Sequence, residues 1–125
     1  KMCKRGDVYY VDFGHNIESC KQSGIRPAVI VSNNRANLYS PVITVVPLTS
    51  RIHKKRSLPT HVYIPQGCGT GLPKSSMALA EQVETIDKKY LLEKKGTVEN
   101  IAVMEKITKA LQIQIGAVER YNDSR

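Results

Sequence analysis

Residues 24–33 read GIRPAVIVSN, and residues 27–32 within this stretch form a nearly unbroken apolar run. A short apolar run bounded by a glycine and by polar residues is typical of a strand that is buried on both faces. We therefore predict a central strand at residues 27–32. The polar residues 33–37 that follow it predict a turn or a single turn of helix.

Two segments rich in β-branched and aromatic residues lie on either side of this strand in the sequence. Residues 8–13 read VYYVDF between two glycines, and residues 42–48 read VITVVPL. Both compositions predict strands. Pro47 cannot donate a hydrogen bond to a neighbouring strand, so it favours an edge position or a bulge. Residues 14–24 are polar and broken by glycines, which predicts a long loop.

Two further strands are expected at residues 61–64 and 77–83. Residues 61–64 alternate polar and apolar side chains, as a half-buried strand does. The glycines and Pro73 of residues 67–74 favour a loop between the two segments. Residues 77–83 contain alanine and leucine, which also suit helices, and we interpret them as a strand.

The last third of the chain changes to a helical pattern. Residues 87–92 predict a short helix with Asp87 near its N-cap, and Thr97 is placed at the N-cap of a longer helix. Apolar residues then recur every three to four positions, at Val98, Ile101, Met104 (or Ala102), Ile107 and Leu111. This spacing puts them on one helix face, which we expect to pack on the core. Residues 113–118 end the helix or add a last strand.

Strands followed by a helix predict an α+β fold that is mainly β. We expect a twisted antiparallel sheet or small barrel whose open face the C-terminal helix covers. The 125 residues suit one domain, 1–125, with its core over about 4–118. No apolar run approaches the roughly 20 residues that span a bilayer, and residues 1–5 lack the apolar stretch of a signal peptide. The expectation is a cytoplasmic protein.

The chain is strongly basic. Its 19 Lys and Arg residues against 11 Asp and Glu residues give a net charge of +8 and a pI of about 9.5. Such a charge favours polyanionic partners, with nucleic acid before a membrane surface. The three cysteines and three histidines show no metal-ligand spacing, so neither a metal nor a cofactor is expected.

Four motifs occur in order along the chain: RGDVY at residues 5–9, GIRPAVIVSN at 24–33, VPLTS at 46–50 and LAEQVETID at 79–87. With them the chain resembles, from residue 4 to about 118, the MazF/PemK (Kid) family of toxin endoribonucleases of type II toxin–antitoxin systems. The resemblance implies a CcdB/PemK-type, Src-homology-3-like barrel that forms a homodimer. It also implies metal-independent cleavage of single-stranded RNA at short motifs, with 2′,3′-cyclic phosphate and 5′-hydroxyl ends. The implied partner is a MazE-like antitoxin with an acidic, partly disordered tail.

By position, the resemblance assigns the catalytic pair to Arg26 and Thr49. When a ribose 2′-hydroxyl attacks the adjacent phosphate, negative charge builds on the nonbridging oxygens, and a guanidinium offers them a charged, planar fork of donors. Thr49 supplies a hydroxyl that can donate to the same phosphate. Arginine is a poor base, so Arg26 is expected to stabilise charge, while His15 or His53 could move protons.

RNA contacts are expected from the loop at residues 14–24, from the basic cluster at residues 51–56 and from nearby polar residues. The candidates are Lys21, Gln22, Asn34, Ser50, Arg51, His53, Lys54, Lys55 and Gln82, with Asn16 and Tyr39 as further candidates for reading bases. Lys21 stands where many members of the family carry glutamate, a departure that could strengthen RNA binding or remove a proton carrier. For Gln82, a structural hydrogen bond is an equal alternative.

Two other functions fit the same sequence. A gyrase poison of the CcdB type shares the fold but would not need the Arg26 and Thr49 pair. A non-catalytic small barrel that binds nucleic acid would account for the charge alone. Cleavage of RNA in excess EDTA separates the nuclease from both.

Overall fold

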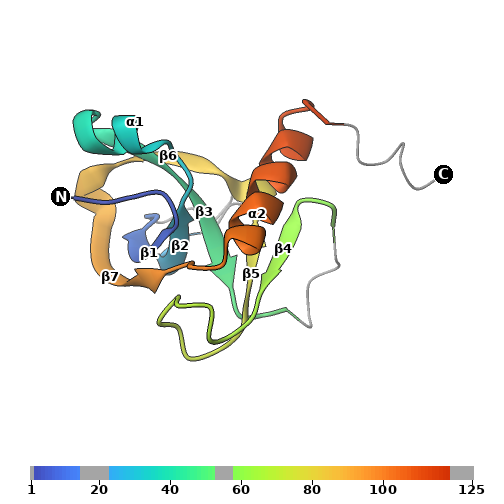
Figure 1. Cartoon of the computed structure of the whole chain (residues 1–125). Coiled ribbons are helices and arrows are strands. Elements are labelled where there is room, and N and C mark those ends of the chain that lie inside the picture. The colour runs from blue at the N-terminus through green and yellow to red at the C-terminus, as the bar shows by residue number, and fades with distance from the viewer. Residues whose placement is uncertain (1, 15–22, 53–57, 119–125) are drawn as a thin grey trace.

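The computed structural model describes residues 2–14, 23–52 and 58–118. Within them the chain forms seven strands and two α-helices, which Figure 1 labels. The strands are β1 (Asp7–Asp12), β2 (Ile25–Ile30), β3 (Val42–Thr49), β4 (His61–Ile64), β5 (Ser76–Leu79), β6 (Glu84–Asp87) and β7 (Leu91–Thr97). The α-helices are α1 (Asn34–Tyr39) and α2 (Ile101–Gln114), and the short 3-10 helices are η1 (Ala80–Gln82) and η2 (Lys88–Tyr90).

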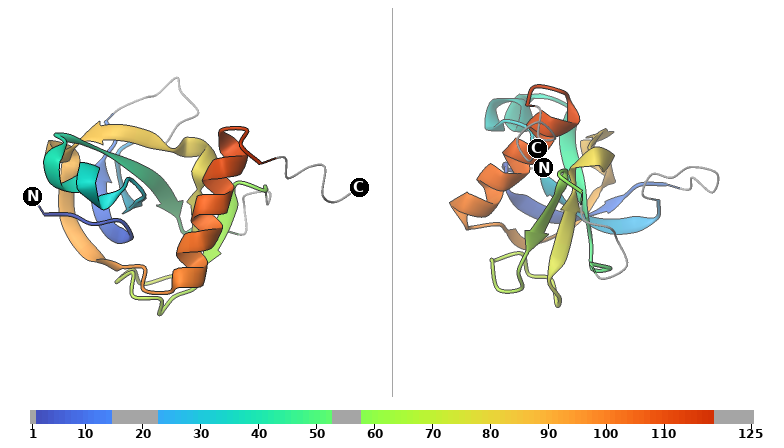
Figure 2. Two further views of the ribbon diagram at one scale, coloured as in Figure 1. Left: turned by 45° about the horizontal axis from the view of Figure 1, so that its top comes forward. Right: turned by 90° about the vertical axis from the view of Figure 1, so that its right-hand side faces the viewer.

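The strands form one antiparallel sheet in the order β4-β5-β3-β2-β1-β7, with β6 paired to β3 beside this path. The sheet curls around the core, as the two views of Figure 2 show. Among the described strands the path ends at β4 on one side and at β7 on the other, so the sheet is open and not a closed barrel. The predicted α+β class with a twisted antiparallel sheet and a C-terminal helix is confirmed.

β2 is the central strand that its sequence predicts. Ala28, Val29 and Ile30 are each 0% exposed. Val29 packs in a core cluster that includes Ile107 of α2. Ala28 and Ile30 belong to a second cluster, with residues of β1, β3, β6 and β7. Burial on both faces explains the unbroken apolar run, because polar residues alternate along a strand only where one face meets water.

Pro47 lies in β3, which is a central strand and not the expected edge strand. On one side β3 pairs with β2. On its other side, β6 pairs with residues up to Val45, and β5 pairs from Leu48 onwards. Pro47 therefore falls between two ladders on that side, where a missing hydrogen-bond donor is tolerated.

Residues 87–92 are not the predicted helix. β6 ends at Asp87, η2 covers only Lys88–Tyr90, and Leu91 begins β7, which pairs with β1. Asp87 makes no side-chain cap hydrogen bond. The segment has helix-favouring residues, but pairing with a distant strand decides its structure, because strand preference depends strongly on tertiary context. The strand expected at 77–83 is likewise shorter, since β5 ends at Leu79 and η1 follows.

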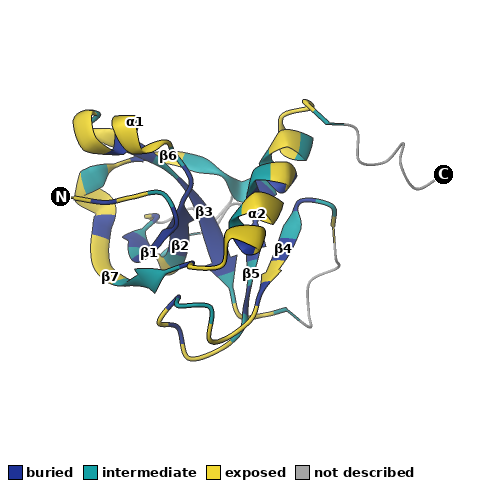
Figure 3. Cartoon of the chain, viewed as in Figure 1, coloured by how far each residue is buried: buried dark blue, intermediate teal, exposed yellow. Residues whose placement is uncertain are grey.

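α2 covers part of the sheet as predicted, and of the predicted apolar stripe Val98, Met104, Ile107 and Leu111 pack in or against the core. Its N-cap is Asn100 and not Thr97, whose hydroxyl instead donates to Asp7 Oδ1 (3.0 Å). Ile101, the first residue of the helix, is 75% exposed and is the one predicted stripe residue that does not pack on the core. Figure 3 shows the exposed outer side of α2. The residues that α2 buries are Val103, Ile107 and Ala110. Residues 113–118 end the helix and add no strand.

We expect Asn100→Ala to lower the free energy of unfolding by about 1 kcal/mol. The Asn100 side chain accepts hydrogen bonds from the backbone N–H groups of Ala102 (2.9 Å) and Val103 (3.4 Å), and alanine removes this acceptor. Urea titration measures the change. Lys109→Ala, at an exposed position of the same helix, is the control and should shift stability by less than about 0.5 kcal/mol. Equal losses in the two variants would contradict the capping role.

Candidate active site

A cavity of about 290 Å³ opens beside β2 and β3. Its walls come from β1, β2, β3, the start of β5 and the loop before β5. The lining residues are Tyr10, Arg26, Pro27, Leu48, Thr49, Ser50, Arg51, Leu72, Pro73, Lys74 and Ser76. Four of the residues predicted for the site, Arg26, Thr49, Ser50 and Arg51, therefore meet in one place.

The antiparallel pairing of β2 and β3 brings Arg26 and Thr49 together. Ala28 is paired with Pro47. The β2–β3 pairing ends at this pair, and Arg26 and Thr49 each lie two residues beyond it on their strands. Two residues 23 positions apart in the sequence (49 − 26) thus face one cavity.

Each member of this pair is held by one hydrogen bond to a nearby backbone group. Arg26 Nε donates to the Ser23 carbonyl (3.1 Å), which leaves its two terminal nitrogens, as far as the described residues go, for a ligand. Thr49 Oγ1 accepts from the Arg51 N–H (3.1 Å), so the Thr49 hydroxyl hydrogen can be donated elsewhere. The two side chains can therefore present donors together to one anion.

The charge of the cavity has a single sign. Arg26, Arg51 and Lys74 supply cations, Thr49 and Ser50 supply hydroxyls, and no acidic residue is among the described residues of the lining. Arginine forks match the geometry of phosphate oxygens. The arrangement is suited to bind a phosphate group and to stabilise negative charge that develops on it.

Residues 4–115 match the family described as PemK-like, MazF-like toxin of type II toxin-antitoxin system. The chain belongs to this family. It is similar to an endoribonuclease from a mycobacterial species, with 29% identity over 93% of each chain and a TM-score of 0.73. A mycobacterial endoribonuclease solved in complex with its cognate antitoxin is 31% identical, with 93% of this chain and 97% of that chain covered and a TM-score of 0.75. MazF from Deinococcus radiodurans, at 20% identity over 93% of this chain and 98% of that chain, shares the fold, with a TM-score of 0.77.

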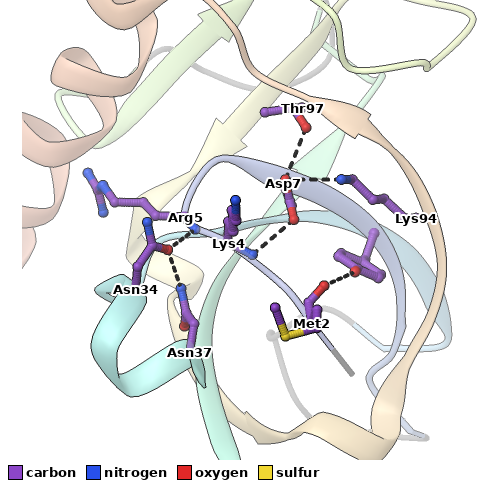
Figure 4. A network of polar contacts seen from close by, with 9 residues as sticks. Met2, Lys4, Arg5, Asp7, Asn34, Asn37, Lys94 and Thr97 are labelled. Carbon is purple, nitrogen blue, oxygen red and sulfur yellow. Dashed lines mark hydrogen bonds and ion pairs between the residues drawn. The ribbon is translucent and has the colours of Figure 1, made fainter. Parts of the chain in front are cut away.

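The RGDVY motif of this chain joins parts of the fold and does not line the cavity. The Arg5 guanidinium donates to the Val31 carbonyl and to the Thr108 hydroxyl, which ties the end of β2 to α2. The buried Asp7 lies 3.5 Å from Lys94 Nζ and also accepts from the Thr97 hydroxyl (Figure 4). This first motif is therefore structural, whereas the second and third motifs supply the cavity.

The structure does not bring Asn34 or Gln82 into the cavity. Asn34 begins α1, which follows the opposite end of β2 from Arg26, and its Oδ1 accepts from the Arg5 N–H (2.7 Å) and from the Asn37 amide (3.2 Å) (Figure 4). Tyr39 ends the same helix. Gln82 lies in η1, which contacts α2. The candidates that lie outside the described residues are His15, Asn16, Lys21, Gln22, His53, Lys54 and Lys55.

Among the polar lining residues, sequence reasoning misses three, namely Tyr10, Lys74 and Ser76. A signal for Tyr10 is present, because adjacent residues of a strand point to opposite faces, so Tyr9 and Tyr10 cannot share one environment. No such local signal exists for Lys74. It belongs to a loop, and the packing of that loop depends on distant strands.

The described part of the chain has neither a candidate metal site nor a membrane-spanning helix. No group of three or more His, Cys, Asp or Glu side chains there could hold a metal ion. His61 Nε2 instead lies 3.0 Å from Glu81 Oε2, in a pair outside the cavity. No helix in this part of the chain has the length and apolar character needed to cross a membrane.

Proposed function

We propose that this chain is a metal-independent endoribonuclease toxin that cleaves single-stranded RNA at short sequence motifs. The proposal is carried by the placement of Arg26 and Thr49 on adjacent strands in a cavity whose described lining residues include cations and no acids. Solved relatives with 29% and 31% identity that are named endoribonucleases support it. Ser50 and Arg51 are proposed as RNA contacts in the same cavity. Lys21, Gln22, His53, Lys54 and Lys55 stay proposed RNA contacts from the sequence.

The proposed reaction is an intramolecular transesterification. The ribose 2′-oxygen bonds to the adjacent phosphorus, the bond from phosphorus to the 5′-oxygen breaks, and the products carry a 2′,3′-cyclic phosphate and a 5′-hydroxyl. Arg26 holds the nonbridging oxygens with its two terminal nitrogens, and Thr49 donates to the same group. A preorganised donor of this kind contributes about 3–4 kcal/mol to transition-state stabilisation.

The reaction also moves a proton from the 2′-hydroxyl and delivers one to the 5′-oxygen. No histidine and no carboxylate is among the described residues that line the cavity. Arg26 keeps its charge at any working pH, which suits electrostatic stabilisation better than proton transfer. The proposed proton carriers are therefore His15 and His53, which the sequence places in the two segments that precede and follow the catalytic pair.

The cationic cavity also suits an inhibitor with negative charge. We propose a MazE-like antitoxin whose acidic tail binds over Arg26, Arg51 and Lys74 and blocks RNA. The 31% identical relative was solved in complex with its cognate antitoxin, which supports this partner. We further propose that the toxin acts as a homodimer in the cytoplasm.

The deciding experiment incubates purified protein with a long single-stranded RNA in excess EDTA. We expect discrete fragments with 5′-hydroxyl and 2′,3′-cyclic phosphate ends, because the cavity supplies charge stabilisation without a metal. DNA of the same sequence is the matched control and should stay intact, since it lacks the attacking 2′-hydroxyl. Intact RNA would favour a non-catalytic binding module. If RNA is cleaved without EDTA but stays intact in excess EDTA, the metal-independent mechanism is contradicted.

A further inference from the structure

We propose that Tyr10 is a stacking platform for a nucleobase of the RNA, next to the phosphate held by Arg26 and Thr49. This inference rests on the proposed function and assigns a base-binding subsite within the same cavity. It concerns how the substrate is positioned and not the chemical step.

The cavity has an apolar part that phosphate binding does not explain. Besides its cations and hydroxyls, it is lined by Tyr10, Pro27, Leu72 and Pro73. Its volume of about 290 Å³ corresponds to roughly ten water molecules, which is more than a phosphate group alone needs. In a polynucleotide, the flat and partly apolar group beside each phosphate is the base.

The position of Tyr10 in the sheet places it at this cavity. Tyr9 is 4% exposed and packs in the core, so strand alternation turns the half-buried Tyr10 to the other face of β1. Tyr10 is paired with Pro27, the residue directly after Arg26. Arg26 is paired with Val11, so strand alternation turns it to the other face from Tyr10, yet both residues line the same cavity.

The Tyr10 ring is held in place by a cation from the next strand. Lys95 Nζ lies 5.6 Å from the ring centroid, and the same ammonium is 3.9 Å from Glu93 Oε2. Lys95 does not line the cavity. The ammonium therefore contacts the ring from outside the cavity and leaves the cavity side for a base. A ring held in this way loses little conformational freedom when a base stacks on it.

Stacking on an aromatic ring accepts any base, because every base has a π-face. Tyr10 is thus expected to fix the position of one nucleotide relative to Arg26, whatever its identity. The sequence preference of the enzyme would come from other residues.

The chain has no tryptophan, so Tyr10→Trp creates a single fluorescent reporter at the proposed platform. The probe is a mixed-sequence, single-stranded 2′-O-methyl RNA, which cannot be cleaved by 2′-hydroxyl attack. We expect this RNA to quench the tryptophan at saturation, while a fully abasic oligonucleotide of equal length does not. Equal quenching by the abasic strand, or no quenching by the saturating RNA, overturns the proposal.

Tyr39→Trp is the matched control. Tyr39 also has a cation over its ring, Arg35 at 5.7 Å, but it is 74% exposed and ends α1, at the opposite end of β3 from Thr49. It should show no quenching that depends on bases. Quenching of equal size at Tyr39 would show nonspecific contact and would overturn the platform.

Affinity gives a second measurement that does not need the tryptophan. Fluorescence anisotropy of a labelled 2′-O-methyl RNA should show binding roughly tenfold or more weaker for Tyr10→Leu than for Tyr10→Phe, which keeps the ring. Equal affinities would contradict stacking. Both assays read binding without cleavage. If RNA quenches the tryptophan but the protein does not cut RNA, the proposed reaction is contradicted and the stacking platform is supported. If the protein cuts RNA but shows no quenching, the platform is contradicted and the reaction is supported.

Discussion

Arg26→Ala should reduce the rate of RNA cleavage by about 10²–10³ or more, the range found when one preorganised donor to a developing oxyanion is removed. Arg26 is exposed, and its one hydrogen bond among the described residues goes to the nearby Ser23 carbonyl. Removal of the Arg26 side chain should therefore change the free energy of unfolding by less than about 0.5 kcal/mol. Single-turnover cleavage and urea titration on the same preparation measure both effects.

The conservative variants separate the charge of Arg26 from its geometry. Arg26→Lys keeps a positive charge but loses the planar fork, so it should recover only part of the lost rate. Thr49→Ser keeps the hydroxyl that donates to phosphate and accepts from the Arg51 N–H, whereas Thr49→Val removes it with little change in volume. The serine variant should cleave faster than the valine variant. Undiminished cleavage by Arg26→Ala would overturn the assignment of the site.

Gly71→Ala should lower the free energy of unfolding by about 3–5 kcal/mol, from backbone strain together with overpacking. Gly71 has φ +73°, and a Cβ at this position would lie 2.0 Å from the Lys95 carbonyl oxygen and 2.8 Å from the Lys95 carbonyl carbon. These are backbone atoms of β7, so a rotamer change cannot relieve the contact. Urea titration at equilibrium measures the loss.

Gly67→Ala is the matched control in the same loop. Gly67 also has a positive φ, +94°, but a Cβ there would meet nothing within 4 Å. It should therefore show only the strain of the backbone, about 1–2 kcal/mol. If Gly71→Ala and Gly67→Ala lose the same amount, the contact with β7 is not what restricts Gly71.

The contact between this loop and β7 also bears on the cavity. Gly69 approaches β7 in the same way, since its Cβ would lie 2.4 Å from the Thr97 carbonyl oxygen. The residues that follow, Leu72 to Lys74, line the cavity. Gly71→Ala should displace this loop. The variant protein should therefore bind the 2′-O-methyl RNA more weakly than the unsubstituted protein, even under conditions where the variant remains folded.

The sequence alone determined the elements whose signals are local. The apolar run at residues 27–32, which contains Ala28, Val29 and Ile30, predicts a strand buried on both faces, because a central strand leaves no face for polar residues. The order of strands and a last helix predicts the mainly antiparallel class. The motifs around Arg26 and Thr49 predict a pair of residues that line one cavity in the structure.

Only the tertiary structure decided the features that depend on which distant segments pair. Residues 87–92 favour a helix locally, yet Leu91 begins a strand because β1 offers it a partner. Tyr10 and Lys74 reach the cavity because β1 pairs with β2 and because the glycine loop packs on β7. The hydrophobic periodicity and the composition of a segment indicate how that segment is buried, but not which other segment it pairs with. Pairing between segments far apart in the chain is set by how all of them bury their apolar faces together, so it can be read only from the folded molecule.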